Sequence, residues 1–188
     1  MIDTTRTLAL IGSAAGGVEH IRAELVEPAL SRGWRVAVTL TPTAGAWLAA
    51  SGELDRIAEL TGLPCRVASR LPSEPSPHPP IDCFLVCPAT ANTVSKLALG
   101  LGDSQALTTA VEAVGAGTAP VVVFPTVNAA HHRHPAWKWH TSALQDAGVH
   151  LLTGERWWAA HEPRSGLGQQ VPWQRVLDEL DRLVPPRS

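Results

Sequence analysis

Residues 7–31 read TLALIGSAAGGVEHIRAELVEPALS, and this stretch determines how the chain begins to fold. The mostly apolar run at 7–11 predicts a buried strand, and the small residues at 12–17 predict a tight turn. Apolar residues then recur near a spacing of about 3.6 residues, which predicts a helix over 17–31. A buried strand, a glycine-rich turn and a helix are typical of the first unit of a parallel α/β fold.

Strands and helices alternate along the rest of the chain. Further strands are predicted at 34–40, 82–87, 120–124 and 149–152, and 66–69 fits a short one. Helices are predicted at 44–60 with a break at 51–52, and at 92–101, 108–114, 136–147 and 173–183. Strands that are apolar on both faces and separated by helices indicate a parallel sheet covered on both sides. We therefore expect a doubly wound, three-layer α/β/α fold, flavodoxin-like or Rossmann-like.

Two segments lack such periodicity. Residues 71–80 hold five prolines, which exclude a helix or an inner strand and predict a surface loop. Residues 153–172 are loop-like and precede the last predicted helix. We expect a single domain over 1–188, in which 153–172 is a mobile loop.

The composition excludes several classes of protein. The chain has 188 residues, with 15 Lys and Arg against 17 Asp and Glu, so its near-neutral charge argues against a nucleic-acid partner. Hydrophobic residues make up 45%, which supplies a core and excludes wholesale disorder, and three cysteines are too few for a disulfide scaffold. No apolar run approaches the roughly 20 residues of a membrane span, and the start lacks a signal-peptide pattern. We therefore expect a cytoplasmic protein with no membrane partner.

Ligands of such sheets bind at the carboxyl ends of the strands. The first strand ends in the small residues of 12–17, whose turn lets a helix N-terminus approach an anion, and Ser13 adds a hydroxyl. The second strand ends in Thr39, Thr41 and Thr43, with no acidic residue to hold a ribose hydroxyl. These two ends favour a mononucleotide phosphate over NAD, although an ordinary tight turn would also need small residues.

The third and fourth strand ends share a pattern. Residues 87–93 read CPATANT, in which Pro88 is expected to stop the strand and Asn92 or Thr93 to cap the next helix. Residues 124–128 read FPTVN. The amides of Asn92 and Asn128 could both reach a planar heterocycle from neighbouring strand ends.

These residues resemble a known family. PATANT at 88–93 resembles the PASANT motif of the homo-oligomeric flavin-containing cysteine decarboxylases, and VSKLALGLGDSQALTT at 94–109 is similar to the helix that follows it. The family's second motif, P-x-M-N-x-x-M-W, corresponds to PTVNAAHH at 125–132. The resemblance covers most of 7–152. It implies a parallel α/β sheet with FMN bound between the subunits of a homotrimer, or of a homododecamer of four trimers.

The resemblance also implies roles for individual residues, with Ser13 and Thr43 holding the FMN phosphate. The cofactor-binding residues would be Gly12, Ser13, Ala14, Thr41, Thr43, Pro88, Ala89, Thr90, Asn92 and Thr109. The catalytic residues would be His78, Asn92 and Asn128. The substrate-binding residues would be Asn128, His131, His132, Trp157, Arg164 and Ser165. The chemistry is the oxidation of a C-terminal cysteine beside its sulfur, followed by loss of CO₂ to leave an enethiol.

The chain departs from the family pattern in the second motif and in the histidine. Val127, His131 and His132 replace both methionines and the tryptophan of the motif. The family's active-site histidine lies about fourteen residues before the PASANT proline, a register that falls on Glu74 here, and the nearest histidine is His78. The base is therefore His78, or has moved to His131 or His132, or is absent.

A third departure decides between branches of the family. The phosphopantothenoylcysteine decarboxylases carry a cysteine in the late loop, and 153–172 has none. This favours a peptidyl-cysteine decarboxylase that forms aminovinyl-cysteine in a ribosomal peptide, so the expected partner is a cysteine-ending peptide. A phosphopantothenoylcysteine decarboxylase and a non-catalytic flavin-binding regulator are the alternatives. The histidines between 131 and 140 have no acid or cysteine nearby in sequence, so no metal is expected.

Overall fold

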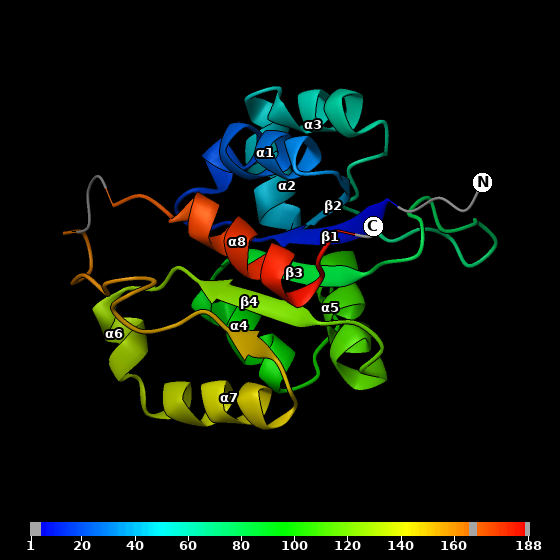
Figure 1. Cartoon of the computed structure of the whole chain (residues 1–188). Coiled ribbons are helices and arrows are strands. Elements are labelled where there is room, and N and C mark those ends of the chain that lie inside the picture. The colour runs from blue at the N-terminus through cyan, green and yellow to red at the C-terminus, as the bar shows by residue number, and fades with distance from the viewer. Residues whose placement is uncertain (1–4, 166–168, 187–188) are drawn as a thin grey trace.

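Five parallel strands form the centre of the molecule (Figure 1). The structure is a computed structural model, and it describes residues 5–165 and 169–186. The strands are β1 (Arg6–Gly12), β2 (Trp34–Leu40), β3 (Cys83–Ala89), β4 (Val121–Pro125) and β5 (His150–Leu151). Their order is β2-β1-β3-β4-β5, so the direction of winding reverses between β1 and β3. This is the flavodoxin-like order, and it confirms the predicted three-layer fold.

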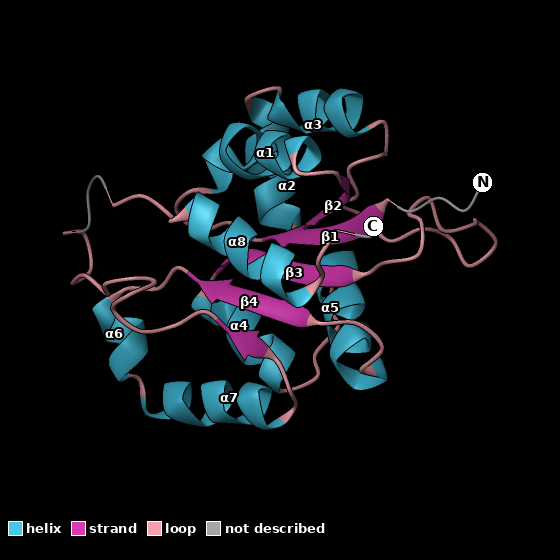
Figure 2. Cartoon of the chain, viewed as in Figure 1, coloured by secondary structure: helices cyan, strands magenta, loops and turns pink. Residues whose placement is uncertain are grey.

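Helices cover both faces of the sheet (Figure 2). The helix after β1 is continuous but changes its winding, from a 3₁₀ turn at Val18–His20 through a π-helical stretch at Arg22–Val26 to α1 (Glu27–Ser31). The others are α2 (Pro42–Ala50), α3 (Glu53–Thr61), α4 (Ala91–Ala98), α5 (Gln105–Ala116), α6 (Ala129–Arg133), α7 (Pro135–Asp146) and α8 (Trp173–Leu183). Among the described residues, no helix combines the length and apolarity needed to cross a membrane.

Alternation along the strands divides the core into two apolar layers. Val122 and Phe124 of β4 belong to the layer that contains α8, whereas Val121 and Val123 belong to the layer that contains α4, α5 and α7. All four side chains are almost completely buried. The continuous apolar runs read in the sequence therefore arise because both faces of the sheet are covered.

The last helix is fastened to the edge of the sheet by a buried charge network. Arg6, which is 2% exposed, lies 3.0 Å from Asp181 of α8, and Trp34 Nε1 donates a hydrogen bond of 3.0 Å to the same carboxylate. Burial alone would raise the pKa of Asp181, but hydrogen bonds from Arg32 and Trp34 and the charge of Arg6 outweigh it and hold the pKa below its usual value. This network holds the C-terminal part of α8 against the first residues of β1 and β2.

Several predicted boundaries need correction. Pro88 does not end β3, which continues to Ala89 across a cis Cys87–Pro88 peptide and an irregular register. The helix predicted at 108–114 begins at residue 105, because the Ser104 side chain caps it by accepting from Leu107 N. Residues 66–69 contribute only a single bridge, from Arg66 to β2. The predicted break at 51–52 is confirmed, since Gly52 has φ 73° between α2 and α3.

Candidate functional site

A cavity of about 440 Å³ lies where β1, β2 and β3 end, between the beginnings of α2 and α4. We call it the α2–α4 cavity. It brings together six of the ten predicted cofactor residues: Ser13, Ala14, Thr41, Thr43, Thr90 and Asn92. These residues come from three different turns, and only the order of the parallel strands brings them side by side.

The start of α2 supplies hydrogen-bond donors to this cavity. Thr41 is the N-cap residue of α2, but its side chain makes no hydrogen bond to the helix. Pro42 follows it at the first helical position, where it removes no useful donor. The remaining amides of the first turn therefore stay available to an anion, together with the positive end of the helix dipole.

Ser13 has a different environment from the one predicted. Its hydroxyl is 2% exposed, donates 2.8 Å to Pro88 O and accepts 2.9 Å from Thr90 N. The single hydroxyl proton is thus directed to the end of β3 and away from the cavity. Ser13 joins the ends of β1 and β3 and fixes the position of Thr90.

The other predicted cofactor residues at these strand ends are buried in the framework. A Cβ added at Gly12 would lie 2.8 Å from Leu40 Cδ2, so the β1 end can approach β2 only with glycine there. Pro88 and Ala89 are buried within β3. These three residues hold the lining residues in place without lining the cavity themselves.

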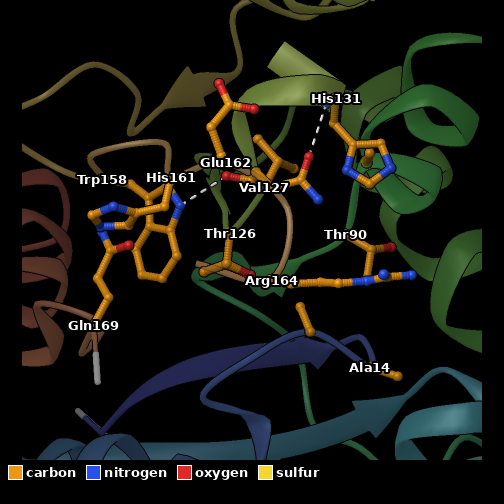
Figure 3. A pocket seen from close by; sticks show the side chains of 13 residues that line it. Ala14, Thr90, Thr126, Val127, His131, Trp158, His161, Glu162, Arg164 and Gln169 are labelled. Atoms are coloured by element: carbon orange, nitrogen blue, oxygen red, sulfur yellow. Dashed lines mark hydrogen bonds between the residues drawn. The ribbon is translucent and has the colours of Figure 1, made fainter. Parts of the chain in front are cut away.

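A second cavity of about 400 Å³ adjoins the first at the ends of β3 and β4, and we call it the β4-end cavity. Both cavities are lined by Ala14 and Thr90, so they meet at these two residues. Figure 3 shows Arg164 extended across the β4-end cavity, with Trp158 and His161 on one side in this view and His131 on the other.

Asn128 positions the helix at the edge of this cavity. Its Oδ1 accepts a hydrogen bond of 3.0 Å from His131 N and caps α6, a helix that the sequence analysis did not predict. The sequence does carry a signal for α6, because asparagine is a favoured N-cap residue whose side chain accepts from the backbone N–H three positions later. Within the described ranges the Asn128 side chain makes no other hydrogen bond, so its Nδ2 donors remain for a ligand.

Thr126 is a cavity residue that the sequence analysis missed. Its Oγ1 atom is buried and has no hydrogen-bond partner among the described residues. A buried hydroxyl without a partner costs about 1–3 kcal/mol, so such an atom at a cavity wall favours a polar ligand group there. A heterocycle with donor and acceptor edges fits this requirement.

The loop after β5 is attached to α6 and β4 by contacts on its described part, 153–165. Trp158 Nε1 donates 2.9 Å to Val127 O, and Ala129 N donates 2.8 Å to His161 O. Glu162 accepts from both terminal nitrogens of Arg133 at 2.5 and 3.0 Å, and hydrogen bonding to that guanidinium lowers the pKa of Glu162. The loop predicted to be mobile, 153–172, includes 166–168, which lie outside the described residues.

The predicted substrate residues divide into two groups. Asn128, His131 and Arg164 line the β4-end cavity. Trp157 is buried against Phe124, with ring centroids 6.4 Å apart, and is part of the core. The other two have partners outside the cavity lining, because the His132 ring lies 5.7 Å from the Trp137 ring and Ser165 Oγ donates 2.7 Å to Glu162 O. This loop also contributes Trp158, His161, Glu162 and Gln169 to the lining, and none of them is in the set of predicted substrate-binding residues.

His78 and Thr109 lie in neither cavity. Both line a third cavity of about 320 Å³, the α5-face cavity, which shares no lining residue with the other two. His78 Nε2 is 3.0 Å from Pro64 O, and Thr109 Oγ1 accepts 3.0 Å from Gln105 Nε2. A single chain therefore does not bring His78 to Asn92 and Asn128. Residues 5–165 and 169–186 also contain no group of three side chains arranged to hold a metal ion.

The fold and the adjoining cavities at its topological switch point define a flavodoxin-like protein with a mononucleotide-sized site. The chain belongs to the Flavoprotein family, whose model matches residues 5–185. This confirms the resemblance drawn from PATANT and supports the prediction of FMN.

Three known proteins are similar to the chain. It is 39% identical over 109 residues to the coenzyme A biosynthesis bifunctional protein CoaBC of Thermococcus kodakarensis, a match that covers 57% of this chain and 24% of that protein. The FMN-dependent cysteine decarboxylase SpaF has a TM-score of 0.65 at 21% identity over 95% of this chain and 97% of its own. TvaF, an FMN-dependent cysteine decarboxylase from thioviridamide biosynthesis, has a TM-score of 0.62 at 26% identity over 80% and 91%. The chain spans about a quarter or less of the curated relatives it matches.

Proposed function

We propose that this protein is an FMN-dependent decarboxylase that oxidises the C-terminal cysteine of a ribosomal peptide to an enethiol, the precursor of aminovinyl-cysteine. The observation that carries the proposal is the junction of the two cavities at Ala14 and Thr90. A flavin held in the α2–α4 cavity and a cysteine residue in the β4-end cavity would be direct neighbours there. Bound FMN supplies the two-electron oxidation of the carbon beside the sulfur.

The residues present suit such a cofactor. The first-turn amides of α2 and the hydroxyls of Thr41 and Thr43 would hold the phosphate, which helix N-termini bind without any cationic side chain. Asn92 would meet a polar edge of the ring system, and the unpartnered Oγ1 of Thr126 would meet a polar group that occupies the β4-end cavity. In this arrangement Ser13 acts through the backbone of Thr90 and does not itself donate to the phosphate.

His131 is the best-placed base in a single chain. It lines the β4-end cavity beside Asn128, where it would take the thiol proton of the cysteine. Arg164 lines the same cavity and has no ion-pair partner in 5–165 or 169–186, so its charge is free to hold the peptide carboxylate. His78 would reach a flavin only from a neighbouring subunit of the homotrimer or homododecamer that the family resemblance implies. We propose this assembly and a cytoplasmic location as part of the same function.

The described part of the loop would exclude water from the reaction. Trp158 closes one side of the β4-end cavity and is held there by its bond to Val127 O. The absence of cysteine in 153–172 favours release of the enethiol over its reduction to a thiol. The two structural relatives that are FMN-dependent cysteine decarboxylases agree with this proposal. The 39% identity to CoaBC favours the second candidate, a phosphopantothenoylcysteine decarboxylase.

The test combines a spectrum with a mass measurement. The purified protein is loaded with FMN and mixed without oxygen with a peptide ending in cysteine, with a serine-ending peptide of equal length as the control. With the cysteine peptide we expect bleaching of the flavin bands and a mass loss of about 46 Da, the sum of CO₂ and two hydrogens. The serine peptide should produce neither change. A protein that takes up no FMN would refute the proposal. Turnover of phosphopantothenoylcysteine alone would support the second candidate, and FMN binding without any turnover would support the regulatory alternative.

Two variants identify the base. His131→Asn should abolish turnover while FMN remains bound, and His78→Asn should retain turnover if each active site is completed within one chain. If His78→Asn loses turnover while His131→Asn keeps the wild-type rate, the base is His78 of a neighbouring subunit.

A further inference from the structure

Within a single chain, the α5-face cavity lies apart from the two cavities of the proposed decarboxylation. It lies between α5 and the chain segment that contains the proline-rich loop, and its polar lining includes Arg66, Arg70, His78 and Glu112. Its volume of about 320 Å³ lies at the lower end of the range for small-molecule sites. Because it shares no lining residue with the α2–α4 and β4-end cavities, a ligand there would be independent of FMN within one chain.

Arg66 is held rigidly at the wall of this cavity by its main chain. Its N–H donates 2.9 Å to Val38 O, and its carbonyl accepts 2.7 Å from Leu40 N, so the residue is paired with β2 on both sides. Its side chain has neither an ion pair nor a hydrogen bond to any described residue, and the Nη2 atom is buried. A guanidinium stays protonated in proteins, so a partly buried one without a partner requires an acceptor from elsewhere.

A second arginine and a histidine lie near Arg66. Burial and the nearby charge of Arg70 lower the pKa of Arg66, although Glu74 opposes them. Burial and the charge of Arg66 lower the pKa of His78, and its hydrogen bond to Pro64 O opposes them. The guanidinium of Arg70 donates to the carbonyls of residues 71 and 74 and to no carboxylate. Two arginines thus line the cavity with one acid, Glu112, and Arg66 has no ion pair with any described carboxylate.

We propose that the α5-face cavity binds a small oxyanion, a phosphate ester or a carboxylate, between Arg66 and Arg70. A guanidinium presents paired donors whose spacing matches both kinds of oxyanion, which explains why an arginine is left there without a protein partner. Ser76 and Thr109 line the same cavity and supply hydroxyls for further oxygens of the ligand. A bound anion would compensate the charges of Arg66 and Arg70.

The experiment measures the melting temperature of the FMN-loaded protein in the presence of inorganic phosphate or sodium acetate, with sodium chloride keeping the ionic strength constant. We expect a saturable rise with at least one of the two anions and none with chloride. Saturation with phosphate indicates a phosphate ester as the natural ligand, and saturation with acetate alone indicates a carboxylate. Arg66→Met should weaken the binding by about tenfold or more.

Matched variants keep the result interpretable. Arg182→Met removes the same charge from an exposed arginine that pairs with Glu179, and it should leave anion binding unchanged. Arg70→Met tests the same cavity from an exposed position, should the Arg66 variant fold poorly. Equal anion binding by the Arg66 and Arg182 variants, or no saturable rise at all, would overturn the proposal. Competition between phosphate and FMN in flavin-free protein would also overturn it, because the anion would then occupy the α2–α4 cavity. None of these measurements depends on the turnover of cysteine peptides, so they test the anion site separately from the proposed decarboxylation.

Discussion

Ser13→Ala tests whether the β1–β3 bridge is a structural requirement. The substitution removes the acceptor of the partly buried Thr90 N–H, which has no other partner among the described residues, and this costs about 1–3 kcal/mol. It also removes the bond to Pro88 O, but that carbonyl keeps the 3.1 Å bond from Ser13 N, so the second loss adds only about 0.5–1 kcal/mol. We therefore expect the free energy of unfolding of the flavin-free protein to fall by about 1.5–4 kcal/mol.

Urea denaturation followed by tryptophan fluorescence measures this change, since the chain has seven tryptophans. With a slope near 2 kcal/mol per molar urea, the midpoint should fall by about 0.75–2 M at constant slope. Ser31→Ala is the control, because its hydroxyl donates 3.0 Å to Glu27 O on an exposed helix and should change stability by less than about 0.5 kcal/mol. If Ser13→Ala leaves the flavin-free protein as stable as Ser31→Ala does and only weakens FMN, the hydroxyl serves the phosphate and our reading of the bridge is wrong.

Three further perturbations follow from single contacts. Gly45→Ala should destabilise the fold by about 1–2 kcal/mol despite better helix propensity, because the new Cβ would lie 2.6 Å from both Cγ atoms of Val67; Val67→Ala in the same chain should restore stability in urea titrations. Thr126→Val should stabilise the flavin-free protein by up to about 1 kcal/mol and weaken FMN or peptide binding. If the variant binds both FMN and the peptide as tightly as the wild-type protein does, Oγ1 makes no ligand contact. His78 has a pKa below its ordinary 6.5 because of burial and Arg66, so the unfolded chain binds its proton more readily and stability should fall as pH drops below about 6.5; calorimetry of His78→Asn should show a shallower fall, and an unchanged slope would contradict the shift.

The layered fold could be predicted because its signals are local. β1 and β4 are short apolar runs next to glycine or proline, and the break between α2 and α3 coincides with Gly52, whose left-handed backbone favours glycine. The boundary errors have equally local causes. The Ser104 cap makes α5 start earlier than predicted, and an irregular strand register accommodates Pro88 inside β3. Hydrophobic periodicity reveals neither feature.

Most of the lining of the α2–α4 cavity could also be predicted, because parallel strands bring their carboxyl ends together on one side of the sheet. The loop residues could not be assigned in this way. Trp157 and Trp158 are adjacent in an irregular segment, and only the fold shows that Trp157 packs on Phe124 in the core while Trp158 lines the cavity. Thr126 carried no motif, and its importance follows from the lack of a partner, a property of the folded chain.

The position of His78 was the hardest to predict, because proline fixes the local conformation of a loop without determining which face of the molecule the loop covers. Residues 71–80 run to the α5 side of the sheet, so His78 meets Arg66 there and not the ends of β3 and β4. Asn92, Asn128 and Ser13 all lie at the carboxyl ends of the strands, and His78 does not. The base must therefore be another residue at these strand ends, or a residue of a second subunit. His131 satisfies the first condition through the cap that Asn128 places on α6, so the proposed catalysis within one chain depends on that short helix.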